Sequence, residues 1–296
     1  MTYTQAAVQP IADKHTIVDG HRIAYATFGE GEPVVLVHGT PSSSLIWRHV
    51  VPRLTAVGFK AHVFDLLGYG ESERPWRKDV DTSISGQVRI LEAMMDVWGL
   101  DTTHLVAHDI GGGVAQRFGV FHLPRLRTLT LIDSVSFDSY PSRRTQEQMS
   151  QGLDALVRAP EAQHRAHFET WLRSASADPE RFANDALPAY LDYISGPVGQ
   201  ASYIQHQMRH YDPKHTMEIA DRVAELGRIP VQLIWGREDT WQVLDWAHRL
   251  HKAIPGSELH VVENAGHFSL EDRPEAVSEH LIHFLQAQVR APLNRE

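Results

Sequence analysis

The 296-residue sequence contains no cysteine. Disulfide bonds, thiolate nucleophiles and cysteine-ligated metal sites are therefore excluded. No apolar run approaches the roughly 20 residues that a membrane-spanning helix requires. Residues 1–15 also lack the basic stretch and apolar core of a secretory signal. From these absences we expect a cytoplasmic protein that does not enter a membrane.

Positive charge is scarce relative to negative charge. The chain has 28 Lys and Arg residues against 37 Asp and Glu residues, which gives a formal net charge of −9. Because nucleic-acid surfaces need clustered positive charge, we expect no nucleic-acid partner. Hydrophobic residues make up 42% of the sequence, which is typical of a globular protein. The sequence does not indicate an oligomeric state.

Short apolar runs alternate with helical patterns along most of the chain. Unbroken runs without strict alternation are typical of strands that are covered on both faces. A stripe of apolar residues three or four positions apart, from Ile84 to Trp98, predicts an amphipathic helix. This alternation predicts an α/β fold with a doubly wound, mostly parallel sheet. The predicted strands are residues 16–18 and 22–25 in a hairpin, then 33–37, 61–64, 104–107, 129–132, 231–235 and 259–262.

One long segment interrupts the alternation. Residues 138–226 contain no strong strand signal and are rich in helix-forming residues. We predict a helical cap over 138–226, inserted into a core domain formed by residues 1–137 and 227–296. The chain after Gln288 is expected to fray.

The sharpest chemical signal surrounds Asp109. This residue follows a predicted strand, opens a helical stretch and has the small residues Ala107 and Gly111 two positions away on either side. Small neighbours are typical of the tight nucleophile elbow, in which Asp109 occupies the place of a nucleophilic serine. The alternative interpretation is an aspartate that simply caps the following helix.

A second signal is the sequence His38-Gly39-Thr40-Pro41, which follows an earlier strand of the same predicted sheet. A backbone amide from this loop and the amide of Ile110 could converge on one oxygen atom. Two such amides stabilise negative charge that develops during a reaction. We therefore predict an oxyanion hole formed by Thr40 and Ile110.

Two further residues follow the last predicted strands. Asp239 comes after residues 231–235, and His267 comes after residues 259–262. The chain order of nucleophile, acid and base is that of α/β-hydrolases. Taken alone, Asp239 could cap a helix and His267 could be a surface histidine. Their common position at the carboxyl ends of strands favours a catalytic set with Asp109.

These motifs resemble those of the α/β-hydrolase superfamily, in the branch that contains haloalkane dehalogenases and epoxide hydrolases. The resemblance includes residues 65–72, similar to the D-x-x-G-x-G-x-S loop, and residues 38–44 with Trp47. It implies an eight-stranded sheet with a helical lid. It also implies a cofactor-independent enzyme in which Asp109 forms an alkyl ester that water, activated by His267, hydrolyses. Some relatives place their acid where Asp133 stands, so Asp133 is the alternative to Asp239.

The departures from this branch bear on the substrate. Dehalogenases usually have a tryptophan after the nucleophile, where this chain has Ile110, and many have an asparagine where it has Thr40. The side chain of Ile110 cannot donate a hydrogen bond to a halide. Epoxide hydrolases instead protonate the opening ring with lid tyrosines, and Tyr211 lies where such a tyrosine is often found.

We therefore predict an epoxide hydrolase acting on a small apolar organic substrate. A haloalkane dehalogenase is the alternative, and a non-catalytic binding protein with this fold is the remote one. The predicted pocket residues are His38, Trp47, Tyr203, Trp241 and Phe268. No cofactor or metal is expected.

Overall fold

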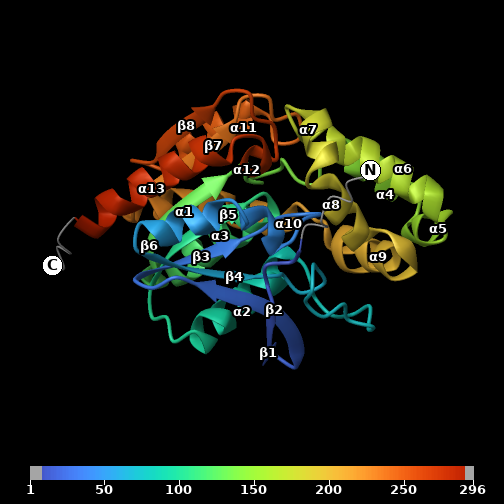
Figure 1. Cartoon of the computed structure of the whole chain (residues 1–296), viewed down its shortest axis with the longest axis horizontal. Helices are drawn as coiled ribbons and strands as arrows, with labels where there is room; N and C mark the ends of the chain where they lie inside the picture. Colours follow the sequence, from blue (N-terminus) through green and yellow to red (C-terminus); the bar gives the residue numbers. More distant parts are fainter. Residues whose placement is uncertain (1–8, 291–296) are drawn as a thin grey trace, which may run out of the picture.

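An eight-stranded sheet forms the centre of the computed structural model, which describes residues 9–290 (Figure 1). The strand order is β1-β2-β4-β3-β5-β6-β7-β8. Strand β2 is antiparallel to its neighbours, and all other neighbouring strands are parallel. The strands are β1 (Lys14–Val18), β2 (His21–Phe28), β3 (Glu32–Val37), β4 (Phe59–Phe64), β5 (Thr103–His108), β6 (Leu126–Ile132), β7 (Val231–Gly236) and β8 (Glu258–Val262). The predicted α/β fold and its eight-stranded sheet are confirmed.

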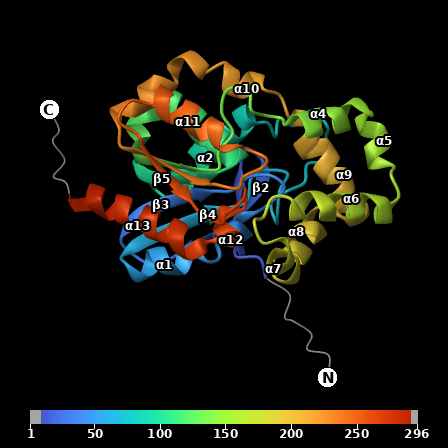
Figure 2. The same ribbon diagram turned by 90° about the horizontal axis from the view of Figure 1, so that it is seen from above.

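The central strands are apolar because helices cover both of their faces. Every residue of β5 and of β7 is buried. Figure 2 shows α1 (Val50–Ala56) and α13 (Pro274–Arg290) on one side of the sheet, and α2 (Ile84–Val97) and α11 (Leu244–Ala253) on the other. Helix α3 (Ile110–His122) packs beside α2. Three short helical turns complete the core: η1 (Ser44–Trp47), η2 (Leu123–Arg125) and α12 (Ser269–Asp272). The helix η5 (Ala220–Arg228) crosses the predicted boundary between cap and core at residue 226 and packs against α3.

Between β6 and β7 the chain forms a series of mostly short helices. Figures 1 and 2 place most of them together on one side of the molecule, beside the sheet. They are α4 (Arg143–Ser150), α5 (Leu153–Val157), α6 (Glu161–Arg173), α7 (Pro179–Asn184), α8 (Leu187–Ile194), α9 (Gly196–Ser202), the π-helical η3 (Tyr203–Gln207), η4 (Met208–His210) and α10 (Lys214–Met217). We propose that residues 138–226 act as one cap unit over the core.

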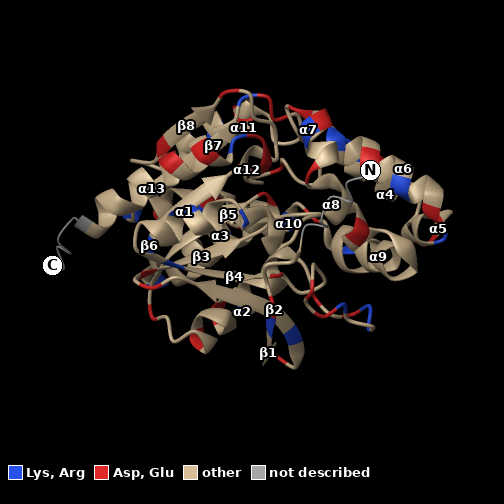
Figure 3. Ribbon diagram, viewed as in Figure 1, with Lys and Arg blue, Asp and Glu red and all other residues tan. Residues whose placement is uncertain are grey.

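Three further features are the charge on the cap helices, the character of the helices and the C-terminal end of the described chain. Figure 3 shows basic and acidic residues interspersed along the cap helices. Among the helices of residues 9–290, none combines the length and the apolar character needed to cross a membrane. Helix α13 continues past Gln288 to Arg290, and the rest of the tail that was predicted to fray lies outside the described residues.

Candidate active site

Asp109 stands in a strained turn between β5 and α3. Its backbone angles are φ 53° and ψ −122°, a region that a non-glycine residue rarely adopts. Although it occupies the N-cap position of α3, its side chain makes no capping hydrogen bond. Its carbonyl oxygen instead accepts hydrogen bonds from the amides of Gly112 and Val135, which hold the turn. The carboxylate therefore does not cap the helix. In a nucleophile elbow, too, the side chain at this position serves the reaction rather than the helix end.

The loop after β3 approaches this carboxylate closely. A Cβ atom added to Gly39 would lie 2.4 Å from the Cβ of Asp109, so only glycine fits there. The amide of Thr40 donates a 2.7 Å hydrogen bond to Asp109 Oδ2. The amide of Ile110 also helps to keep the pKa of Asp109 low. Thr40 and Ile110, the predicted oxyanion residues, thus direct both amides toward one carboxylate.

His267 lies between two carboxylates. Its Nδ1 atom is 2.9 Å from Asp239 Oδ2, and its Nε2 atom is 3.5 Å from Asp109 Oδ1. The other oxygen of Asp239 accepts hydrogen bonds from the amides of Trp241 and Gln242, at 2.7 and 2.8 Å. Asp239 therefore caps a turn and at the same time orients the imidazole. It does not cap a helix, because α11 begins at Leu244 and has Val243 as its N-cap.

Asp133, the alternative acid, is engaged elsewhere. One of its oxygens accepts a 2.7 Å hydrogen bond from the amide of Gly236, and the other accepts a hydrogen bond from the Ser269 hydroxyl. Burial, together with the nearby charge of Asp239, raises the pKa of Asp133 well above its ordinary value. The geometry favours Asp239 as the partner of His267.

The electrostatics of the site follow from this arrangement. Burial raises the pKa of Asp109, but the neighbouring His267 outweighs it and brings the pKa below its ordinary value. Burial lowers the pKa of His267, but the charges of Asp239 and Asp109 raise it well above the ordinary value. The resting site therefore holds an imidazolium between two carboxylates.

Tyr211 reaches this site from the cap. Its hydroxyl oxygen is 2.5 Å from Thr40 Oγ1, and Thr40 in turn donates a 3.0 Å hydrogen bond to Gln207 Oε1. Because the single hydroxyl proton of Thr40 is used on Gln207, Tyr211 is the donor toward Thr40. The phenols of Tyr69 and Tyr203 also hydrogen-bond with Tyr211. Burial raises the pKa of Tyr211 well above 10, so its phenol keeps its proton at neutral pH.

A cavity of about 40 Å³, here named the inner cavity, adjoins these groups. Its walls include Thr40, Asp109, Tyr140, Trp171, Tyr211 and Trp241. Of the predicted pocket residues, Trp241 lines it, whereas His38, Trp47, Tyr203 and Phe268 do not.

Each of the other four predicted pocket residues has a different place. Both ring nitrogens of His38 are used: Nδ1 bonds the Gly39 carbonyl, and Nε2 accepts from the amide of Leu66. Trp47 is fully buried in the hydrophobic core. Phe268 is buried beside His267, and Tyr203 packs against Phe168 behind Tyr211. These side chains support the site from behind its walls.

Several wall residues escaped the sequence analysis: Tyr140, Pro141, Ser142, Thr145, Trp171 and Gln242. Gln207 was also missed, although it holds the Thr40 hydroxyl. Five of the six wall residues belong to the proposed cap or its connection to β6, where no local motif marks a functional position. Gln242 lies three residues beyond Asp239, and this proximity is the one sequence signal that could have found it.

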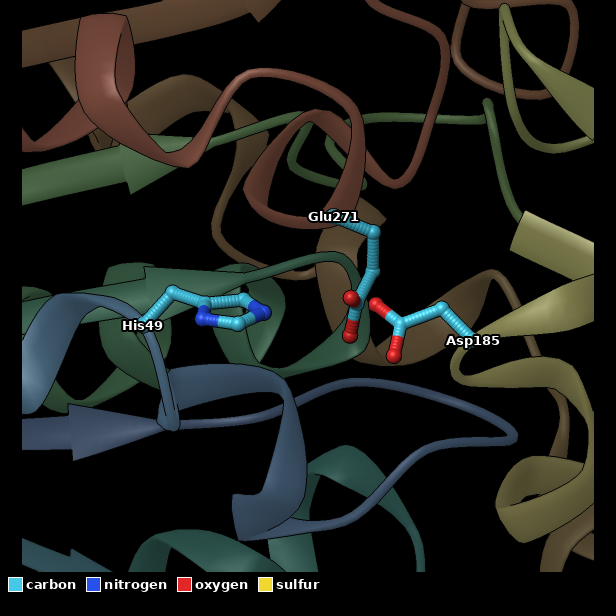
Figure 4. Close-up of side chains that lie close together, drawn as sticks. All are labelled: His49, Asp185 and Glu271. Atoms are coloured by element: carbon cyan, nitrogen blue, oxygen red, sulfur yellow. The ribbon is translucent and has the colours of Figure 1, made fainter. Parts of the chain in front are cut away.

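A second polar cluster connects the cap to the core (Figure 4). Potential ligand atoms of His49, Asp185 and Glu271 lie within 4.8 Å of one another. However, the guanidinium of Arg48 donates to both oxygens of Glu271 and lies 3.2 Å from Asp185. Tyr190 donates a further 2.7 Å hydrogen bond to Glu271. Because the guanidinium of Arg48 already pairs with both carboxylates, the arrangement fits an ion-pair connection better than a metal site.

Comparison with known proteins identifies the family of this chain. Residues 32–274 match the family described as the alpha/beta hydrolase fold. The chain belongs to that family. The structure of an alpha/beta hydrolase fold protein from Burkholderia ambifaria superposes with a TM-score of 0.82. It is 31% identical in sequence, and the match covers 92% of this chain and 97% of that one.

The characterised relatives catalyse different reactions. The chain is 23% identical to a cis-3-alkyl-4-alkyloxetan-2-one decarboxylase of Shewanella oneidensis, over 90% of this chain and 86% of the relative. It is 24% identical to a 2-hydroxy-6-oxononadienedioate/2-hydroxy-6-oxononatrienedioate hydrolase of Cupriavidus pinatubonensis, over 95% and 99%. It is 27% identical to a soluble epoxide hydrolase of a Corynebacterium species, over 93% and 97%. Family membership alone therefore leaves the substrate open.

Proposed function

We propose that this protein is an epoxide hydrolase that uses Asp109 as its nucleophile. The observation that carries the proposal is the position of the Asp109 carboxylate. It lies on a strained backbone turn, makes no capping hydrogen bond and shares the inner cavity with the Tyr211 phenol. A carboxylate at the elbow attacks an sp³ carbon, whereas a phenol at the opposite wall supplies a proton to a leaving oxygen.

In the first step, Asp109 Oδ1 attacks a ring carbon of the epoxide. A bond forms between that oxygen and the carbon, and the ring C–O bond breaks. Tyr211 turns its hydroxyl from Thr40 to the departing oxygen and gives up its proton. The remaining tyrosines, Tyr69 and Tyr203, hydrogen-bond with the phenolate that results. The product of this step is a hydroxyalkyl ester of Asp109.

In the second step, His267 acts as the base. Esterification removes the negative charge of Asp109, so one of the two anions that raise the pKa of His267 is lost. The imidazolium passes its proton to the Tyr211 phenolate, and the neutral imidazole then accepts a proton from the water that attacks the ester carbonyl. The amides of Thr40 and Ile110 stabilise the oxyanion. Collapse breaks the bond between the Asp109 carbonyl carbon and the ester oxygen. The proton of the incoming hydroxyl passes to that oxygen, which leaves as part of the diol, and the carboxylate and the imidazolium are restored.

Two considerations favour an epoxide over an alkyl halide. Ile110 offers a halide only its backbone amide, whereas two phenols, those of Tyr140 and Tyr211, line the inner cavity. The names of two relatives, an epoxide hydrolase and an oxetanone decarboxylase, also refer to small strained oxygen rings. A haloalkane dehalogenase uses the same ester chemistry without a proton donor and is the alternative that the test must separate.

The test traps the ester. In the variant His267→Gln, alkylation of Asp109 continues while hydrolysis stops, so intact-protein mass should increase by the mass of the epoxide. The double variant Asp109→Ala/His267→Gln is the matched control and should gain no mass. Parallel assays of wild-type protein should detect diol from epoxides.

Three other outcomes would contradict the proposed epoxide hydrolase. An unchanged mass with a substrate that the wild type converts rules out the ester. Halide release from haloalkanes without diol formation from epoxides favours the dehalogenase. The absence of both activities, together with retained ligand binding, favours a non-catalytic binding protein.

A further inference from the structure

A second, larger cavity adjoins the inner cavity. This outer cavity has a volume of about 670 Å³, and four of its wall residues, Pro141, Ser142, Trp171 and Trp241, also line the inner cavity. The inner cavity, of about 40 Å³, is much smaller than the outer cavity. Only a small reacting group fits beside Asp109, so the rest of any larger substrate must extend elsewhere.

Two stacked tryptophan side chains form part of the boundary between the two cavities, and one of them packs against His267. Trp171 of the cap stacks on Trp241 of the core, with 4.2 Å between ring centroids and an interplanar angle of 12°. Trp241 also stacks on the imidazole of His267 at 4.9 Å. The indole nitrogen of Trp241 donates to Ser174, another wall residue of the outer cavity. A substrate that follows this boundary outward from Asp109 enters the outer cavity.

The outer cavity is polar although the boundary is aromatic. Nine of its thirteen wall residues have polar or charged side chains, among them Ser142, Arg144, Gln146, Ser174 and Thr240. Most of its charges are already paired, because Arg143 pairs with Glu147 and Asp138 pairs with Arg249. Within residues 9–290, no ion pair involves Arg144, which remains as a donor at this cavity. The hydroxyls of Ser174 and Thr240 and one N–H of Gln146 already donate to backbone carbonyls. The walls therefore carry little net charge, and the guanidinium of Arg144 is their main donor to a ligand.

We propose that the outer cavity binds the tail of the substrate, and that this tail is a polar chain bearing oxygen atoms. The inference rests on the proposed function, because it assigns the reacting epoxide to the inner cavity. It narrows the expectation of a small apolar substrate: only the reacting end is small and apolar. A long alkyl tail would leave the donors of Arg144 without partners, whereas ether or hydroxyl oxygens accept hydrogen bonds from them.

A third cavity provides the internal comparison. The lid cavity, of about 230 Å³, lies among α4, α5 and α6. It shares Arg144 and Glu147 with the outer cavity but shares no wall residue with the inner cavity. A tail that starts at Asp109 therefore reaches the outer cavity first, and filling the lid cavity should not affect it.

The experiment compares three glycidyl ethers in the wild-type protein. One carries a methyl group, one carries the chain of diethylene glycol monomethyl ether, and one carries an alkyl chain of equal length. We expect kcat/KM to be about tenfold higher for the oligoether than for the alkyl substrate, a difference of about 1.4 kcal/mol. Equal values or an alkyl preference would overturn the assignment of a polar tail.

Two matched variants locate the subsite. Gln146 lines only the outer cavity and Gln163 only the lid cavity, and both are exposed residues of cap helices. Gln146→Trp should raise KM for the oligoether about tenfold and leave the methyl ether within about twofold, because only the tail loses space. Gln163→Trp should change neither. Loss of oligoether turnover in Gln163→Trp alone, or equal losses on both substrates in Gln146→Trp, would contradict the outer cavity.

A separate readout covers the failure of the proposed function itself. If the methyl ether neither turns over nor esterifies Asp109 in the His267→Gln variant, the proposed chemistry fails. The subsite is then tested by calorimetric titration with the diol that carries the same oligoether chain. Binding to the wild type and to Gln163→Trp, but not to Gln146→Trp, supports the subsite. Equal binding to all three proteins, or no binding, contradicts it.

Discussion

The sheet core and the helical cap meet at the inner cavity, but they position their side chains in different ways. In the core, backbone hydrogen bonds hold Asp109 and Asp239 at the ends of β5 and β7. Two cap residues at the cavity are placed by side-chain contacts: Tyr211 contacts Thr40, and Trp171 stacks on Trp241. Backbone contacts fix geometry regardless of the neighbouring side chains, whereas the cap contacts depend on each residue involved. Core substitutions should therefore abolish the chemistry, and cap substitutions should change its selectivity.

The largest effect should distinguish two buried aspartates of the core. Asp239→Asn removes the carboxylate that orients His267, and we expect kcat to fall by about 10⁴, as in a serine triad. Asp133→Asn should cost less than about tenfold, because Asp133 does not contact His267 and its raised pKa already favours the neutral form. Steady-state kinetics and thermal unfolding of both variants check this. If kcat falls only slightly in Asp239→Asn but severely in Asp133→Asn, then Asp133 rather than Asp239 orients His267.

A smaller effect is expected from the cap. Tyr211→Phe removes the proton donor and very little volume, so epoxide opening should slow by about 10²–10³ while the melting temperature stays nearly unchanged. The control is Tyr140→Phe, in the neighbouring ring 5.1 Å away, which should be mild. If an alkyl halide is a substrate, its reaction should hardly change. Equal losses on both substrate types would remove Tyr211 from proton transfer.

The smallest predicted effect is a shift with pH. The low pKa of Asp109 keeps the nucleophile ionised in mild acid, so alkylation persists as pH falls. His267 must be neutral to activate water, and Asp239 still raises its pKa in the ester, so hydrolysis slows as pH falls. The ester should therefore accumulate several-fold more at pH 5 than at pH 8, as measured by mass after rapid quenching. Less ester at pH 5 would contradict this order of steps.

The same contrast explains what could be predicted from the sequence. Asp109, Asp239 and His267 directly follow apolar runs, and parallel strands bring their carboxyl ends to one edge, so local patterns are enough to group them. Trp171 and Gln207 reach the site only because short cap helices pack against the core over long sequence distances. No periodicity or motif encodes that packing. The sequence also could not reveal that Asp133 is bonded to Ser269 and Gly236, because these contacts depend on the register of three strands.

The strained turn at Asp109 has a consequence for how this fold diversifies. The turn is held by the backbone carbonyl of Asp109 and by close packing at Gly39, and its side chain contributes no capping bond. Under the proposed mechanism, the nucleophile at this position can therefore be exchanged without rebuilding the scaffold. A hydroxyl there would attack carbonyl carbons, whereas a carboxylate attacks saturated ones. A single codon change at this turn can thus move a lineage between reaction classes while the neighbouring histidine and its acid keep their places.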